Sequence, residues 1–102
     1  MPILKRWSSF RKETVIGEVP NFYGVYELAS GAKDVLYIGE GKLRDRLLTH
    51  FSGGSDPIPG ASYFRYERTE SKNRCVQRQN ALLAEYKREY GRLPRFNQKR
   101  RT

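Results

Sequence analysis

The 102-residue sequence contains one cysteine, Cys75, and one histidine, His50. One cysteine cannot form an internal disulfide, and one cysteine with one histidine cannot supply the ligands of a structural zinc site. Long apolar runs are also missing, because none approaches the roughly 20 residues that a membrane-spanning helix needs. The N-terminus has no apolar stretch followed by a small-residue cleavage site. We therefore expect a cytoplasmic protein, associated with the nucleoid in a prokaryote.

Acidic residues are scarce relative to basic ones. The 11 Asp and Glu residues are outnumbered by 20 Lys and Arg residues, which gives a net charge of +9 at pH 7. At this length one domain is expected, with a compact core rich in aromatic and aliphatic side chains. A charge excess of this size favours polyanionic partners, of which nucleic acid is the first expectation.

The hydrophobic pattern predicts three strands. Residues 22–28 and 35–39 carry β-forming side chains on either side of a turn cluster at residues 30–34, which predicts an antiparallel hairpin. Residues 62–69 alternate well enough for a third strand. The predicted fold is therefore α+β, a small three-stranded antiparallel β-sheet flanked by helices.

Two helices are predicted to flank these strands. An apolar stripe at helical spacing over residues 42–51 predicts the first helix. Thr69 or Ser71 is expected to cap a second, long helix that ends at about Tyr90, with Gly91 as its C-terminal stop.

The remaining segments carry weaker signals. The first nineteen residues are weakly patterned, and Trp7 with Phe10 predicts a short helix that packs on the sheet. Residues 52–60 are rich in Gly and Pro and form a loop, either a plain connection or a substrate-contacting segment. The chain divides into an N-terminal extension at residues 1–19, a domain at residues 20–98 and a basic C-terminal tail at residues 99–102.

Several short motifs recur in a fixed order along the chain. They are Gly24-Val25-Tyr26, Tyr37-Ile38-Gly39, Arg46, His50, Glu85 and Pro94-x-x-Asn97. Each tripeptide alone is a weak signal, but the ordered set resembles the GIY-YIG nuclease family over about residues 20–98. Arg46 fits the family pattern better than Arg44, because its spacing to His50 agrees.

The resemblance implies a divalent-metal-dependent DNA endonuclease that acts in DNA repair, recombination or processing. The catalytic residues that it implies are Tyr26, Tyr37, Arg46, His50 and Glu85, with Glu85 holding Mg²⁺ or Mn²⁺. Phosphodiester hydrolysis needs a base for water, positive charge for the transition state and stabilisation of the leaving oxygen. A tyrosine base needs a neighbouring cation, because an unperturbed phenol titrates near pH 10. Which tyrosine is the base stays open.

The expected partner is duplex or branched DNA, with a protein partner supplying specificity and with the chain itself a monomer or weak dimer away from membranes. The predicted nucleic-acid-binding residues are Lys42, Arg44, Arg95, Asn97, Lys99 and Arg100. Basic side chains serve this purpose because they neutralise phosphates.

Each motif residue also has an ordinary explanation. Tyr26 and Tyr37 suit cross-strand packing, and Glu85 suits a surface pair with Arg88. The alternative function is a non-catalytic basic nucleic-acid-binding module that keeps the GIY-YIG fold, and a third reading is a small basic protein of the ribosomal type. Glu85 disfavours the binding module, because a carboxylate weakens polyanion binding.

Overall fold

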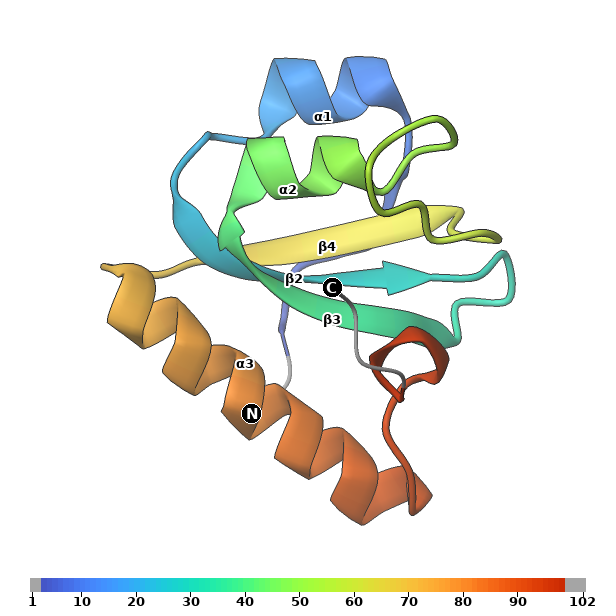
Figure 1. The fold of residues 1–102 in the computed structure, drawn as a ribbon, viewed down its shortest axis with the longest axis vertical. Helices are drawn as coiled ribbons and strands as arrows, with labels where there is room; N and C mark the ends of the chain where they lie inside the picture. The colour runs from blue at the N-terminus through green and yellow to red at the C-terminus, as the bar shows by residue number, and fades with distance from the viewer. Residues whose placement is uncertain (1–2, 99–102) are drawn as a thin grey trace.

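The computed structural model describes residues 3–98. A four-stranded antiparallel sheet in the order β1-β4-β2-β3 lies at the centre, with helices on both of its faces (Figure 1). The elements are β1 Ser8–Ser9, α1 Lys12–Glu18, β2 Tyr23–Ala29, β3 Val35–Lys42, α2 Leu43–Thr49, β4 Tyr63–Arg68, α3 Lys72–Tyr90 and the 3₁₀ helix η1 Arg95–Asn97. The α+β class predicted from the sequence is confirmed.

The predicted count of three strands is wrong, because the short strand β1 adds a fourth. Ser8 lies opposite Phe64 at the edge of β4. A two-residue strand is too short to show the alternation by which strands are found in a sequence. The helix predicted around Trp7 and Phe10 is also wrong, since β1 occupies that segment and the helix α1 begins after it. The segment predicted as an extension contributes Val15 to the core.

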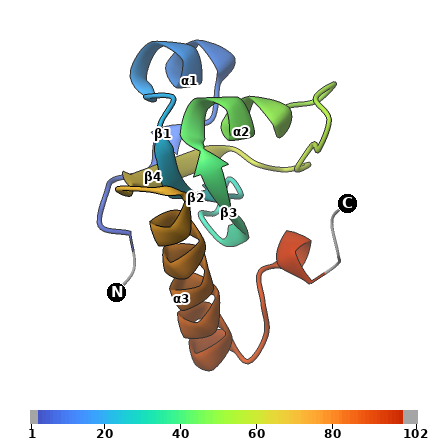
Figure 2. The same ribbon diagram turned by 60° about the vertical axis from the view of Figure 1, so that its left-hand side comes forward.

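The sheet has two covered faces because successive side chains of a strand point in opposite directions. Tyr26 and Leu28 of β2 join a core beneath α1 and α2. Val25 of the same strand joins a second core with Cys75 and Leu82 of α3. Figure 2 shows α1 and α2 together on one side of the sheet and α3 on the other. Residues 26 and 27 therefore belong to different sides of the molecule.

The long helix α3 has clear signals at both ends. The Ser71 hydroxyl oxygen accepts a hydrogen bond from the backbone N–H of Arg74 at 3.2 Å, so the N-cap is Ser71, whereas the Thr69 hydroxyl donates to a backbone oxygen. Gly91 ends the helix at a φ of 77°, a left-handed conformation that glycine adopts without strain. No helix within residues 3–98 is long and apolar enough to cross a membrane.

Candidate active site

Tyr26 and His50 form a buried hydrogen-bonded pair. The Tyr26 hydroxyl oxygen lies 2.7 Å from His50 Nε2, and His50 Nδ1 lies 2.7 Å from the backbone oxygen of Asp56. A carbonyl oxygen only accepts, so we assign the ring proton to Nδ1. In the neutral ring Nε2 then accepts, and the Tyr26 hydroxyl donates to it. The Asp56 carboxylate oxygen Oδ2 lies 3.8 Å from Nδ1.

The loop after α2 holds His50 in this orientation. The Asp56 N–H donates to the Thr49 oxygen at 3.0 Å, and the Ile58 N–H donates to the His50 oxygen at 3.0 Å. A Cβ at Gly54 would lie 2.3 Å from the Thr49 oxygen, so the loop can only fold this closely with glycine there. The predicted loop at residues 52–60 thus holds the His50 ring in place.

The glycines of the two tripeptide motifs have a packing reason. Tyr26 on β2 lies opposite Gly39 on β3. A Cβ at Gly39 would lie 2.3 Å from the Tyr26 hydroxyl oxygen, and a Cβ at Gly24 would lie 2.4 Å from the backbone oxygen of Glu67. Real Cβ atoms do not approach so closely, so the Tyr26 ring can lie across β3 only because residue 39 has no side chain.

Tyr37 and Arg46 complete the cluster, which we call the tyrosine centre: Tyr26, Tyr37, Arg46 and His50. The Tyr37 ring centroid lies 5.2 Å from that of His50 and 6.2 Å from that of Tyr26. Tyr37 is 8% exposed, whereas Tyr26 is fully enclosed. Burial raises the pKa of Tyr26 well above its usual range, and the nearby Arg46 charge opposes this rise. Arg46 interacts electrostatically with both phenols.

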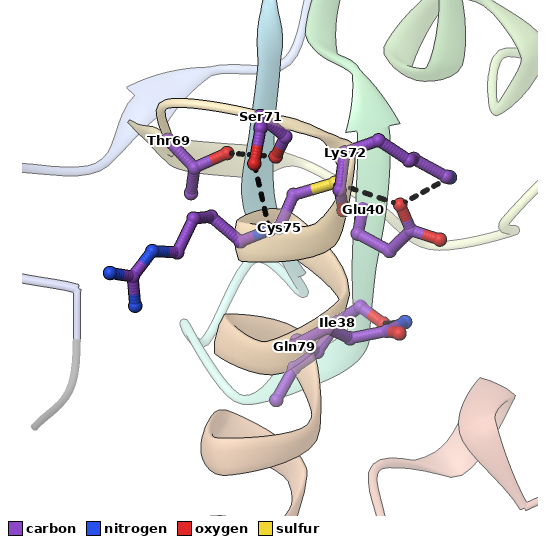
Figure 3. Close-up of polar contacts among 8 residues, drawn as sticks. Ile38, Glu40, Thr69, Ser71, Lys72, Cys75 and Gln79 are labelled. Atoms are coloured by element: carbon purple, nitrogen blue, oxygen red, sulfur yellow. Dashed lines mark hydrogen bonds and ion pairs between the residues drawn. The ribbon is translucent and has the colours of Figure 1, made fainter.

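Glu40, which directly follows the second tripeptide motif, turns its carboxylate toward the start of α3. Its Oε1 accepts hydrogen bonds from Lys72 Nζ at 2.7 Å and from Cys75 Sγ at 3.0 Å (Figure 3). Burial alone would raise the pKa of Glu40, but these partners and, more weakly, Arg46 hold it below its ordinary value. Glu40 therefore ties the start of α3 to β3 while remaining charged.

The structure does not bring Glu85 to the tyrosine centre. Glu85 lines a cavity on the α3 side of the sheet together with Glu27, Ile38 and Leu82. Ile38 and Leu82 belong to the core on that side, and Tyr26 and Tyr37 belong to the core on the other. The sheet therefore separates Glu85 from the tyrosines.

The predicted nucleic-acid-binding residues lie in different surroundings. Lys42 and Arg95 are exposed. The half-buried Arg44 donates from Nε to the Val19 oxygen at 2.9 Å, which ties α2 to the end of α1. Asn97 accepts from the Ile38 N–H at 2.8 Å and donates to the Ile38 oxygen at 3.0 Å, a bond pair that fixes η1 to the edge of β3. The predicted residues Lys99 and Arg100 lie outside the described residues.

A metal ion held by Glu85 does not fit the tyrosine centre. A Mg²⁺ ion that serves a reaction must touch the reacting phosphate, and the Glu85 carboxylate lies on the far side of the sheet from Arg46. Within residues 3–98, no three His, Cys, Asp or Glu side chains gather as a metal-binding group. We therefore derive no chemical step through a metal, and the Mg²⁺ or Mn²⁺ requirement stays a prediction.

The fold and the site define a small basic α+β domain with an enclosed tyrosine, histidine and arginine cluster. Residues 1–89 match the family described as a domain of unknown function, DUF7508, and the chain belongs to this family. A comparison with curated proteins gives no match. The match crosses the predicted boundary at residue 19, in line with the contribution of β1 and α1 to the sheet and core.

Proposed function

We propose that this protein binds nucleic acid and hydrolyses a phosphodiester bond at the tyrosine centre, as a nuclease of the GIY-YIG type. The observation that carries the proposal is the placement of Arg46 beside two phenols, one of which donates to His50 at 2.7 Å. A guanidinium offers a planar fork to two phosphoryl oxygens. Nucleic acid as the partner is supported by the net charge of +9.

In the proposed reaction Arg46 and Tyr37 meet the substrate. Tyr37 is the more exposed of the two tyrosines, and the positive charge of Arg46 favours its ionised form. The ionised Tyr37 takes a proton from the attacking water as the water oxygen forms a bond to phosphorus. The bond from phosphorus to the leaving oxygen breaks, and a solvent water then protonates that oxygen. Tyr26, whose hydroxyl is committed to His50, positions the cluster. Positioning and charge stabilisation are what phosphoryl chemistry asks of a protein.

A second candidate is the non-catalytic nucleic-acid-binding module. The specific observation in its favour is the position of Glu85, which removes the expected metal ligand from the tyrosine centre. In that case the tyrosines and His50 would be packing, and the basic side chains would bind phosphates without chemistry.

Incubation with supercoiled, branched and single-stranded DNA separates the two candidates. The nuclease predicts cleavage by the wild-type protein and a loss of cleavage in Arg46→Lys, with DNA affinity largely kept. DNA binding without cleavage of any substrate would support the binding module. Both candidates require that affinity falls steeply with salt, since each neutralised phosphate adds about 0.9 to the slope of log K against log salt.

A further inference from the structure

A cavity of about 710 Å³ lies on the α3 side of the sheet, away from the tyrosine centre. Residues at the hairpin end of the sheet and in the C-terminal half of α3 line it. Figure 1 shows these two segments and η1, which lies against β3. Trp7, Tyr86 and Tyr90 contribute aromatic rings to its walls. Ile38 and Leu82 lie in its lining and connect it to the core. Its size suits a small aromatic ligand.

The charge of this cavity differs from that of the molecule as a whole. Four acidic and four basic side chains line it, so its formal charge is balanced, although the chain carries +9. A balanced lining gives no net attraction to a strong anion or cation. It favours a neutral group that has both hydrogen-bond donors and acceptors.

An ion pair between the buried Glu27 and the half-buried Arg65 lies in the lining. Arg65 Nε donates to Glu27 Oε1 at 2.6 Å, and Glu27 is 5% exposed. The Arg65 guanidinium also stacks on the Trp7 ring, 4.0 Å from its centroid. Burial raises the pKa of Glu27, and Arg65 opposes this rise. The carboxylate adds hydrogen-bond acceptors to the cavity lining, and the guanidinium adds donors.

We propose that this cavity binds a nucleobase, with its ring against Tyr90 and its polar edge toward Glu27 and Arg65. Neutral bases are planar, stack on aromatic side chains and carry adjacent donors and acceptors, which carboxylate and guanidinium groups read. The base belongs either to a free nucleoside or to an unpaired nucleotide of a strand. The choice of a nucleobase among planar polar ligands rests on the proposed nucleic-acid function.

The test uses Trp7, the one tryptophan of the sequence, whose indole N–H gives one resonance in a proton–nitrogen correlation spectrum. We expect saturable shifts of this resonance with uncharged nucleosides, and shifts of similar affinity with the corresponding monophosphates. Tyr90→Ala should weaken binding about tenfold through lost stacking. Tyr90 is 56% exposed, so the fold tolerates the change, and Phe22→Ala, an exposed aromatic outside this cavity, should leave binding unchanged.

Two results would overturn the proposal. One is the absence of a saturable shift with every nucleoside at millimolar concentration. The other is a shift produced by monophosphates but not by nucleosides, which would indicate a phosphate site.

Further arms of the test identify the source of the base. The site is assigned to unpaired strands if a single-stranded oligonucleotide binds more tightly than its nucleosides and the matched duplex does not bind at this cavity. Equal or tighter binding of free nucleosides assigns it to them. Cleavage is measured separately on Arg46→Lys, across the sheet from this cavity, so a failed nuclease and a failed base site give different results.

Discussion

The two faces of the sheet use polar side chains in different ways. On the α2 face, Tyr26, Tyr37 and His50 form a network of rings around one half-buried cation, Arg46. On the α3 face, acidic and basic side chains balance one another around an open cavity, and the ion pair of Glu27 and Arg65 lies in its lining. Neighbouring residues of one strand serve both faces, because side chains alternate along a strand. A motif in the sequence therefore does not by itself define one site.

The largest effect is expected for Arg46→Lys on the α2 face. A lysine keeps the charge but loses the planar fork, so we expect the cleavage rate to fall by about 100-fold or more while DNA affinity changes little. Single-turnover cleavage and a binding titration measure the two quantities. Arg74→Lys, at an exposed position on α3, is the matched control and should cleave as the wild type does. Equal losses of rate and affinity would make Arg46 a phosphate-binding residue only.

Gly39→Ala should destabilise the fold through the Tyr26 ring. The new Cβ would lie 2.3 Å from Tyr26 atoms, and overpacking of this kind costs about 1 to 3 kcal/mol in the free energy of unfolding. Urea denaturation measures the change. The matched control is Gly17→Ala in α1, where a Cβ meets no atom within 4 Å; it should be neutral or stabilise by about 0.5 to 1 kcal/mol. Equal stabilities of the two variants would contradict the described position of Tyr26.

Tyr26→Phe tests the burial of the phenol through the dependence of stability on pH. Since the pKa of Tyr26 is raised in the folded state, its contribution is complete below the unfolded value of about 10 and is lost as pH rises above it. The free energy of unfolding should fall with pH in this range less steeply for Tyr26→Phe than for wild type. The difference is about 1.4 kcal/mol per pH unit for one group. Identical slopes would mean that the Tyr26 hydroxyl reaches solvent.

The smallest effect is expected for Glu85→Gln. Glu85 lies across the sheet from the tyrosine centre, so we expect the cleavage rate to be unchanged. The free energy of unfolding should change by no more than about 0.5 kcal/mol, as it does for most surface substitutions. The metal-ligand role implied by the family resemblance predicts instead that cleavage disappears. Assays with EDTA, followed by added Mg²⁺ or Mn²⁺, test the metal requirement itself. Loss of cleavage in Glu85→Gln with the fold retained would overturn the separation of the two faces.

Strong local patterns made most of the fold predictable. The hairpin of β2 and β3, the helices α2 and α3 and the stop at Gly91 all follow from alternation, apolar spacing and capping chemistry. The sequence predicted a cap at Thr69 or Ser71, and the structure has it at Ser71. The sequence did not predict the strand β1 or the helix α1. Two residues are too few to show an alternating pattern, and Val15 is the one residue that α1 buries.

The candidate site was predictable only in part. Tyr26, Tyr37, Arg46 and His50 come together as the motif order indicates. Asp56 holds His50 through its backbone oxygen, a role that any residue type could fill and that leaves no mark in the sequence. The prediction that Glu85 lies with the tyrosines is wrong. Glu85 and Leu82 line the same cavity, and Leu82 packs in the core on the opposite face of the sheet.

A crossed comparison of two variants tests the separation of the faces most directly. Arg46→Lys and Tyr90→Ala are each assayed for the rate of DNA cleavage and for nucleoside binding at the Trp7 indole resonance. The account predicts that Arg46→Lys loses cleavage and keeps nucleoside binding, and that Tyr90→Ala weakens nucleoside binding about tenfold and keeps its cleavage of duplex DNA. Loss of both properties in both variants, with the fold intact, would show one shared site and contradict the account.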